Sequence, residues 1–148
     1  MDFYISKEEV VKSLNATLGV VEKRQTLPIL SNVLLEVDES SLKFTATDLE
    51  SEISTTSTIS NFKSGGKTTA PARKLNDLCR LLPDLTEIHF FLDGDNLKIE
   101  TNSGKYNIST LPSEDFPIFE IEEAKSQINI SSKNLKSIIS NTSFAMGN

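Results

Sequence analysis

The chain lacks several features on which catalytic, redox and membrane functions depend. Among 148 residues it has one cysteine, Cys79, and one histidine, His89. A single cysteine cannot form an internal disulfide and has no ligand companion at metal-site spacing, so we expect Cys79 to serve as a small apolar residue in a helix. No apolar run is long enough to span a bilayer, and the start, Met1-Asp2-Phe3-Tyr4, has no basic region leading into an apolar stretch. We therefore expect a cytoplasmic protein.

Patterns of catalysis and metal binding are equally scarce. His89 lies in an alternating strand pattern without an identified nucleophile or acid, so a plain strand position accounts for it. The segment Ser64-Gly65-Gly66-Lys67-Thr68 ends like a phosphate-binding loop but lacks the first glycine of that motif, which argues against an NTPase. Asp48, Glu50 and Glu52 alternate without a further residue to complete a metal site. We expect no metal and no cofactor.

Positive charge is in deficit, with a formal net charge of −6. Such a balance argues at first against a nucleic-acid partner, because phosphate binding requires Lys and Arg. The basic residues are nevertheless concentrated: between Lys63 and Arg80 there are five basic residues and one acid, Asp77. A local basic surface on an acidic protein is able to bind a polyanion on one face. The alternative is a solvated helix face with loop lysines.

The first half of the chain predicts one helix and three strands around one ordinary core. Residues 3–5 alternate as a short strand, and Ser6-Lys7-Glu8-Glu9 is a capping box that begins a helix ending near residues 19–22. Its apolar residues recur at helical spacing: Val10, Val11, Leu14, Leu18 and Val21. Strands are expected over residues 29–37, 42–47 and 52–59, and residues 61–67 are expected to form a flexible connection.

The second half predicts a helix followed by three short strands. Pro71 suits a first-turn position of the helix and Pro83 ends it. Leu75, Leu78, Cys79 and Leu82 share one face, while Arg73, Asn76, Asp77 and Arg80 lie on others. Alternating residues around Phe90, Ile99 and Ile108, separated by turns, then predict an antiparallel meander. The expected fold class is α+β, with two helices packed on antiparallel sheets in the order βαβββαβββ.

The strand, cap and helix pattern of the start recurs near the end of the chain. A shift of 125 residues aligns Ile130 with Ile5, Ser131 with Ser6 and Leu135 with Val10. The pattern predicts one domain over residues 1–125 and the start of a second copy over residues 126–148. A lone strand and helix cannot bury their apolar faces, so we expect this chain to be part of a longer protein.

Four ordered motifs resemble one known family. They are Thr26-Leu27-Pro28-Ile29-Leu30-Ser31-Asn32, Thr47-Asp48-Leu49-Glu50, Pro71-Ala72-Arg73-Lys74 and Ser109-Thr110-Leu111-Pro112, with Asp115-Phe116-Pro117 shortly after. Together they resemble the first domain of the bacterial DNA polymerase III beta subunits, the sliding clamps. The resemblance covers residues 1–125.

The resemblance implies a non-catalytic processivity factor. In this family two chains of three modules close into a ring around duplex DNA, with helices lining the hole. The implied partners are double-stranded DNA without sequence preference, the polymerase III catalytic subunit, the clamp loader and a second copy of the chain. The implied DNA-binding residues are Arg24 and Arg73, with Lys12 and Arg80 as contributors to the electrostatic field.

The resemblance also implies a ring interface. It would use the strand at residues 105–109 and the nearby helix, through Lys74, Leu78, Leu82, Tyr106 and Ile108. An unpaired strand edge beside apolar groups suits β-augmentation across two subunits. The alternative for Tyr106 and Ile108 is that they fill this domain's own core. For the function, the alternative is a small α+β enzyme or ligand-binding module that uses Asp48, Glu50 and Glu52.

Overall fold

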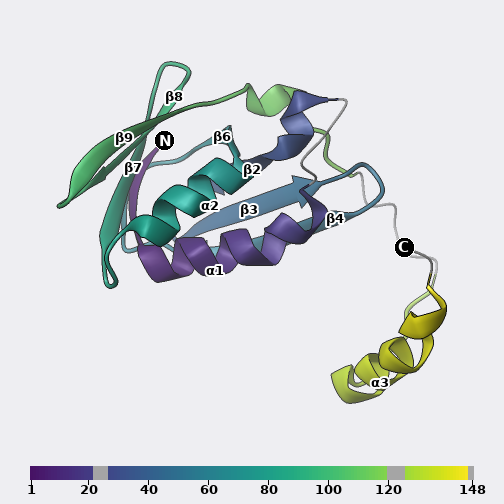
Figure 1. The fold of residues 1–148 in the computed structure, drawn as a ribbon. Coiled ribbons are helices and arrows are strands. Elements are labelled where there is room, and N and C mark those ends of the chain that lie inside the picture. Colours follow the sequence, from purple (N-terminus) through teal and green to yellow (C-terminus); the bar gives the residue numbers. More distant parts are fainter. Residues whose placement is uncertain (22–26, 120–125, 147–148) are drawn as a thin grey trace.

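Two antiparallel sheets and two adjacent helices make up the body of the protein in a computed structural model, which describes residues 1–21, 27–119 and 126–146 (Figure 1). One sheet has the strand order β5 (Asn61–Ser64), β1 (Asp2–Ser6), β7 (Glu87–Asp93), β8 (Asn96–Thr101) and β9 (Gly104–Ser109). The other has the order β4 (Glu52–Thr58), β3 (Ser41–Thr47), β2 (Asn32–Val37) and β6 (Gly66–Pro71). Helices α1 (Lys7–Thr17) and α2 (Ala72–Leu81) lie side by side. The predicted α+β class is confirmed.

Helix α1 begins where the capping box predicts. The Ser6 hydroxyl accepts a hydrogen bond from the Glu9 backbone N–H at 3.3 Å, which satisfies one of the free amides of the first turn. The helix ends at Thr17 and continues as a 3-10 turn over Leu18–Val20. Val10 and Leu14 are buried on its inner face, so the apolar stripe read from the sequence does face the core.

Two segments differ from their predicted structure. Pro28–Ser31 is a 3-10 helix rather than the start of a strand, because Pro28 suits its first turn and Leu30 N–H bonds to the Leu27 carbonyl. Residues 61–67, expected to be a flexible connection, instead form β5 and the first part of β6. The chain passes from one sheet to the other at Gly65 and Gly66, where a Cβ on Gly65 would lie 2.9 Å from the Val37 carbonyl oxygen. Five strands therefore separate the helices instead of three.

Helix α2 and the meander follow their predicted order. Pro71 is the last residue of β6 and the N-cap of α2, one position before its expected place. Strands β7, β8 and β9 pair in sequence, with Phe90 opposite Ile99 and Ile99 opposite Tyr106. This register brings the apolar residues of all three strands to one face of the sheet.

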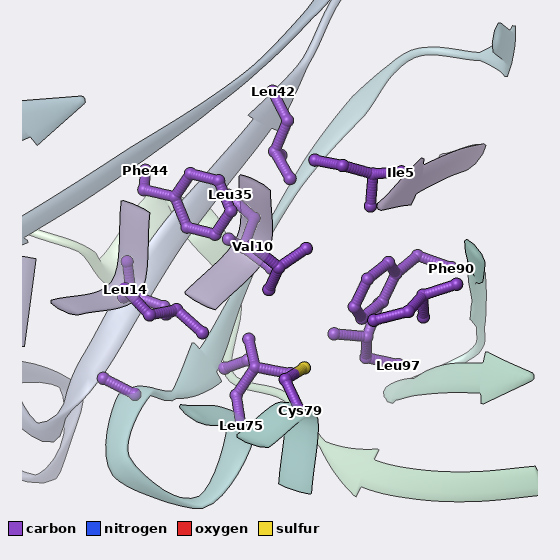
Figure 2. Close-up of a cluster of buried hydrophobic side chains, with 14 of the residues drawn as sticks. Ile5, Val10, Leu14, Leu35, Leu42, Phe44, Leu75, Cys79, Phe90 and Leu97 are labelled. Carbon is purple, nitrogen blue, oxygen red and sulfur yellow. The ribbon is translucent and has the colours of Figure 1, made fainter. Parts of the chain in front are cut away.

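The core lies where the helices meet the inner faces of both sheets. Figure 2 shows Val10 of α1, Leu75 and Cys79 of α2, and Phe44 and Phe90 of the two sheets in one cluster. The Phe3 and Phe90 rings stack with centroids 5.5 Å apart. Burial raises the pKa of the Cys79 thiol to about 12, so this cysteine stays protonated and packs as an apolar group.

Residues of the family-like motifs connect these elements through hydrogen bonds. The Asn32 side chain donates to the Thr69 hydroxyl at 2.9 Å, and that hydroxyl donates to the Leu111 carbonyl at 2.9 Å. Thr69 thereby joins the start of β2 to the segment after β9. The Asp48 carboxylate accepts backbone N–H bonds from Glu50 and Ser51, which lowers its pKa and closes the turn between β3 and β4.

The last helix repeats the first at a shift of 125 residues. Helix α3 spans Ser132–Thr142, and the Ser131 hydroxyl accepts from Asn134 N–H at 3.3 Å as Ser6 does from Glu9. A 3-10 turn, Ser143–Ala145, follows as it does after α1. No strand forms over residues 126–130, where one was expected, since the ladder partner such a strand needs is absent from the described residues. The predicted boundary at residue 125 lies outside those residues.

Candidate nucleic-acid interface

Contacts at one end hold the two helices antiparallel. The Lys7 ammonium, at the start of α1, donates at 2.7 Å both to the Leu82 carbonyl at the end of α2 and to the Asp84 carboxylate. The Glu8 carboxylate accepts from Leu85 N–H at 2.8 Å, and this bond lowers the pKa of Glu8. A cation at a helix C-terminus satisfies its last carbonyls. The relative placement of α1 and α2 is therefore fixed by short polar contacts as well as by the core.

A hollow of about 340 Å³ lies between the helices. From α2 it is lined by four residues at helical spacing, which share one face of the helix. The lining residues are Asn15 and Leu18 of the α1 side and Arg73, Asn76, Asp77 and Arg80 of α2. The Arg73 Nη2 atom donates to the Val21 carbonyl at 2.6 Å, so this guanidinium is anchored across the hollow while its residue remains exposed.

Within residues 1–21 and 27–119, the lysines on the sheets are ion-paired, whereas the basic residues of α2 are not. Five sheet lysines form ion pairs with neighbouring carboxylates: Lys43, Lys63, Lys67, Lys98 and Lys105. Within the described part of the chain, Arg73, Lys74 and Arg80 make none. Within residues 1–21 and 27–119, the cations without an ion pair are therefore those of α2, next to the hollow.

The sheet pairs also alter the carboxylates. Burial raises the pKa of Glu36, but its hydrogen bond and ion pair with Lys67 and its contact with Lys43 bring the pKa below the ordinary value. The Glu100 carboxylate accepts from Lys105, which lowers its pKa. Both acids therefore remain charged at neutral pH, and Glu36 neutralises Lys67, one of the lysines that the sequence places in the basic stretch from Lys63 to Arg80.

The predicted DNA-binding residues differ in where the structure places them. Arg73 and Arg80 line the hollow. Lys12 is 78% exposed on α1 and lies 3.8 Å from the Glu9 carboxylate, which offsets part of its charge. Arg24 lies outside the described residues. The sequence reading missed Asn15 and Asn76 as lining residues, although the i, i+3 spacing of Asn76 from Arg73 was a usable signal.

The predicted interface residues divide by burial. Strand β9 is the edge of its sheet, Tyr106 is 38% exposed and Lys74 is exposed. Leu78 is partly buried against the core. Ile108 and Leu82 instead fill the domain's own core, because both side chains point inward from their elements. Neither side chain is therefore part of the exposed edge: Ile108 follows the alternative stated from the sequence, and Leu82 differs from its expected place.

The acidic cluster has a structural role in the described chain. Asp48 caps its own turn, and the Glu52 carboxylate accepts from Phe119 N–H at 3.0 Å. Over residues 1–21, 27–119 and 126–146, no group of three or more His, Cys, Asp and Glu side chains is placed to hold a metal ion.

His89 bonds to Asp2 at 2.7 Å and stacks on Tyr4. None of the described helices is long and apolar enough to cross a membrane.

This architecture is that of a sliding-clamp module: two antiparallel sheets carry two adjacent helices, and α2 presents cations that have no ion pair among the described residues. The crystal structure of the DNA polymerase III subunit beta from Pseudomonas aeruginosa matches all of this chain and 40% of its own, with a TM-score of 0.93 and 38% identity. The beta sliding clamp of Vibrio cholerae is 37% identical over 148 residues, which is 100% of this chain and 40% of that protein. That of Vibrio harveyi is 36% identical over 145 residues, covering 98% of this chain and 100% of that sequence.

The family model of the DNA polymerase III beta subunit, N-terminal domain, matches residues 1–122. The chain therefore belongs to this family. It spans 40% of the length of the Vibrio cholerae and Pseudomonas aeruginosa proteins. The N-terminal domain of the family thus accounts for all of the two sheets and both helices that enclose the core.

Proposed function

We propose that this chain is the DNA-facing first module of a sliding clamp, a non-catalytic ring that encircles duplex DNA and tethers the replicative polymerase. The observation that carries the proposal is the unpaired arginine face of α2 beside the hollow between the helices. Guanidinium groups suit phosphate because they stay charged and present several donors in a plane. The lysines on the sheets are paired with carboxylates and leave little free positive charge there, which favours DNA on the helix side.

The mechanism follows from topology rather than from tight binding. A closed ring cannot leave duplex DNA without opening, so the contacts inside it need only be weak and independent of sequence. Arg73, together with Arg24 and the field of Lys12 and Arg80, would supply such contacts to phosphates. The implied partners are therefore duplex DNA, the polymerase III catalytic subunit and the clamp loader, in the cytoplasm.

Ring closure would use the free edge of β9. An edge strand presents unpaired N–H and C=O groups. The exposed Tyr106 of β9 and Lys74 and Leu78 of α2 would add side-chain contacts. The buried Leu82 and Ile108 would support this edge from beneath. Because such an interface joins β9 to a different module, the 148-residue chain alone is expected to be monomeric. A two-fold dimer in light scattering at micromolar concentration would contradict this interface.

The test of the function uses full-length chains that carry this module. Arg73→Ala and Arg24→Ala should each weaken retention of duplex DNA, and removing one phosphate-binding side chain should reduce the slope of log K against log salt by about 1. Lys98→Ala is the matched control, since Lys98 is paired with Asp93 on the outer sheet. Equal DNA retention by wild type and the double arginine variant across a salt series would refute the proposal.

A further inference from the structure

The Asn76 amide is the unexplained polar group of the helix pair. The residue is 4% exposed, yet its side chain lines the hollow between α1 and α2. Its Oδ1 atom is buried and has no hydrogen-bond partner among the described residues. Within the same part of the chain, the Nδ2 atom makes no hydrogen bond either. An unpaired buried amide is rare in folded proteins, because nearly all such groups are satisfied.

The geometry of the amide indicates which atom is available to a ligand. The oxygen is sealed from solvent and the residue lines the hollow, so we infer that the amide nitrogen is the end that faces it. An amide nitrogen carries two donors and no negative charge. The donors therefore face the same space as the side chains of Arg73 and Arg80, which lie on the same face of α2 one turn before and one turn after Asn76.

We propose that Asn76 binds a backbone phosphate of duplex DNA through Nδ2, in a seat between the helices completed by Arg73 and Arg80. This inference rests on the proposed function and adds a residue and a phosphate position to it. The anchored Arg73 sets one side of the seat, since its bond to the Val21 carbonyl fixes the guanidinium across the hollow. Asp77, which also lines the hollow, opposes the phosphate and keeps the contact weak.

The seat also explains why the orphan carbonyl is tolerated. If the amide served only packing, an apolar side chain of similar shape could replace it without loss of stability. If Asn76 binds a phosphate, an apolar residue cannot replace it, because the amide nitrogen is needed as a donor even though the amide oxygen stays unpaired. Asn76→Leu should therefore keep or raise the thermal midpoint of the chain while it weakens DNA binding.

The test is an NMR titration of the 148-residue chain with a 16-base-pair duplex at low salt, following the Asn76 side-chain NH₂ and the Arg73 and Arg80 Nε–H signals. All three should shift together and saturate together. Asn76→Leu should raise the Kd by about 10- to 150-fold, the range of one hydrogen bond to a charged group. Asn107→Leu, the same change on the exposed outer face of β9, is the matched control and should leave the Kd unchanged.

The possible outcomes distinguish a failure of the proposed phosphate site from a failure of the proposed function. Arginine signals that shift while the Asn76 NH₂ stays fixed would overturn the phosphate seat and leave the clamp function intact. No response from any of the three groups would overturn both. A titration with inorganic phosphate at the same phosphate concentration forms the second arm, and an equal Asn76 response there would reject duplex DNA as the ligand. An Asn76→Leu variant with a lowered thermal midpoint and unchanged Kd would show a structural role alone.

Discussion

Lys7 is expected to determine the stability of the helix pair more than any other ion-pairing residue of the described chain. Its side chain is only 13% exposed, and its ammonium donates to the Leu82 carbonyl, which is the C-cap of α2, and to Asp84. Lys7→Met keeps the aliphatic stem but removes both donors. The carbonyl of Leu82 then loses its charged partner in a half-buried place.

The magnitude follows from the difference between the two partners. A hydrogen bond from a charged donor contributes about 1.5–3 kcal/mol. Asp84 is 92% exposed, so its ion pair is screened by solvent and adds little. Lys7→Met should therefore cost about 2–3 kcal/mol, most of it at the carbonyl. For a domain of this size such a loss lowers the thermal midpoint by roughly 4–12 °C.

Urea denaturation of wild type, Lys7→Met and Asp84→Asn measures both contributions. The hydrogen bond from Lys7 holds the pKa of Asp84 below its ordinary value of 3.8. The stabilising effect of this bond is therefore complete when the pH lies above the ordinary pKa of Asp84. It is lost as the pH falls through the lower pKa that Asp84 has in the folded state. The small difference between wild type and Asp84→Asn should disappear in that acid range, while the Lys7→Met deficit persists. An Asp84→Asn variant as unstable as Lys7→Met at pH 7 would refute the reasoning.

Three further changes have expected outcomes. Asp77→Asn removes the carboxylate that lines the hollow, so DNA retention by the full-length ring should increase, and a filter-binding salt series that shows weaker retention would contradict this. Leu85 has a backbone φ of 57° and is 90% exposed, so Leu85→Asn should raise the free energy of unfolding by about 0.5–1 kcal/mol, measured in urea. A decrease would show that the leucine side chain contributes to packing. With a pKa of about 12, the buried Cys79 thiol should react with a disulfide reagent at pH 8 only at the rate of unfolding. Immediate reaction of the native chain would contradict its burial.

The sequence predicted those elements whose apolar side chains alternate, or recur at helical spacing, over a long stretch. The capping box at Ser6 and Glu9 and the apolar stripe of α1 have one interpretation each, and the structure bears it out. The meander was readable because turn residues separate three alternating segments. Strand β5 was missed because it is a short edge strand with one apolar residue, Phe62, so its strand character depends on its pairing with β1.

The candidate site was readable only in part. Helical spacing places Arg73 and Arg80 on one face of α2, but the sequence gives no indication that sheet lysines such as Lys67 are neutralised. That neutralisation depends on cross-strand neighbours, which a linear charge count does not contain. The burial of Ile108 likewise follows from the register between β8 and β9, because alternation alone does not distinguish an interface face from a core face.

The repeat gives the strongest physical argument about residues 126–146. Thr17 donates its hydroxyl to the Ser13 and Leu14 carbonyls, and Thr142 makes the same bonds to Ile138 and Ile139. Two helices that share cap, length and final turn at a constant shift are built to pack in the same way. Leu14 is buried in α1, whereas its counterpart Ile139 is 54% exposed in α3. The apolar face of α3 is therefore left unpacked among the described residues, and we propose that residues 126–148 begin a second module.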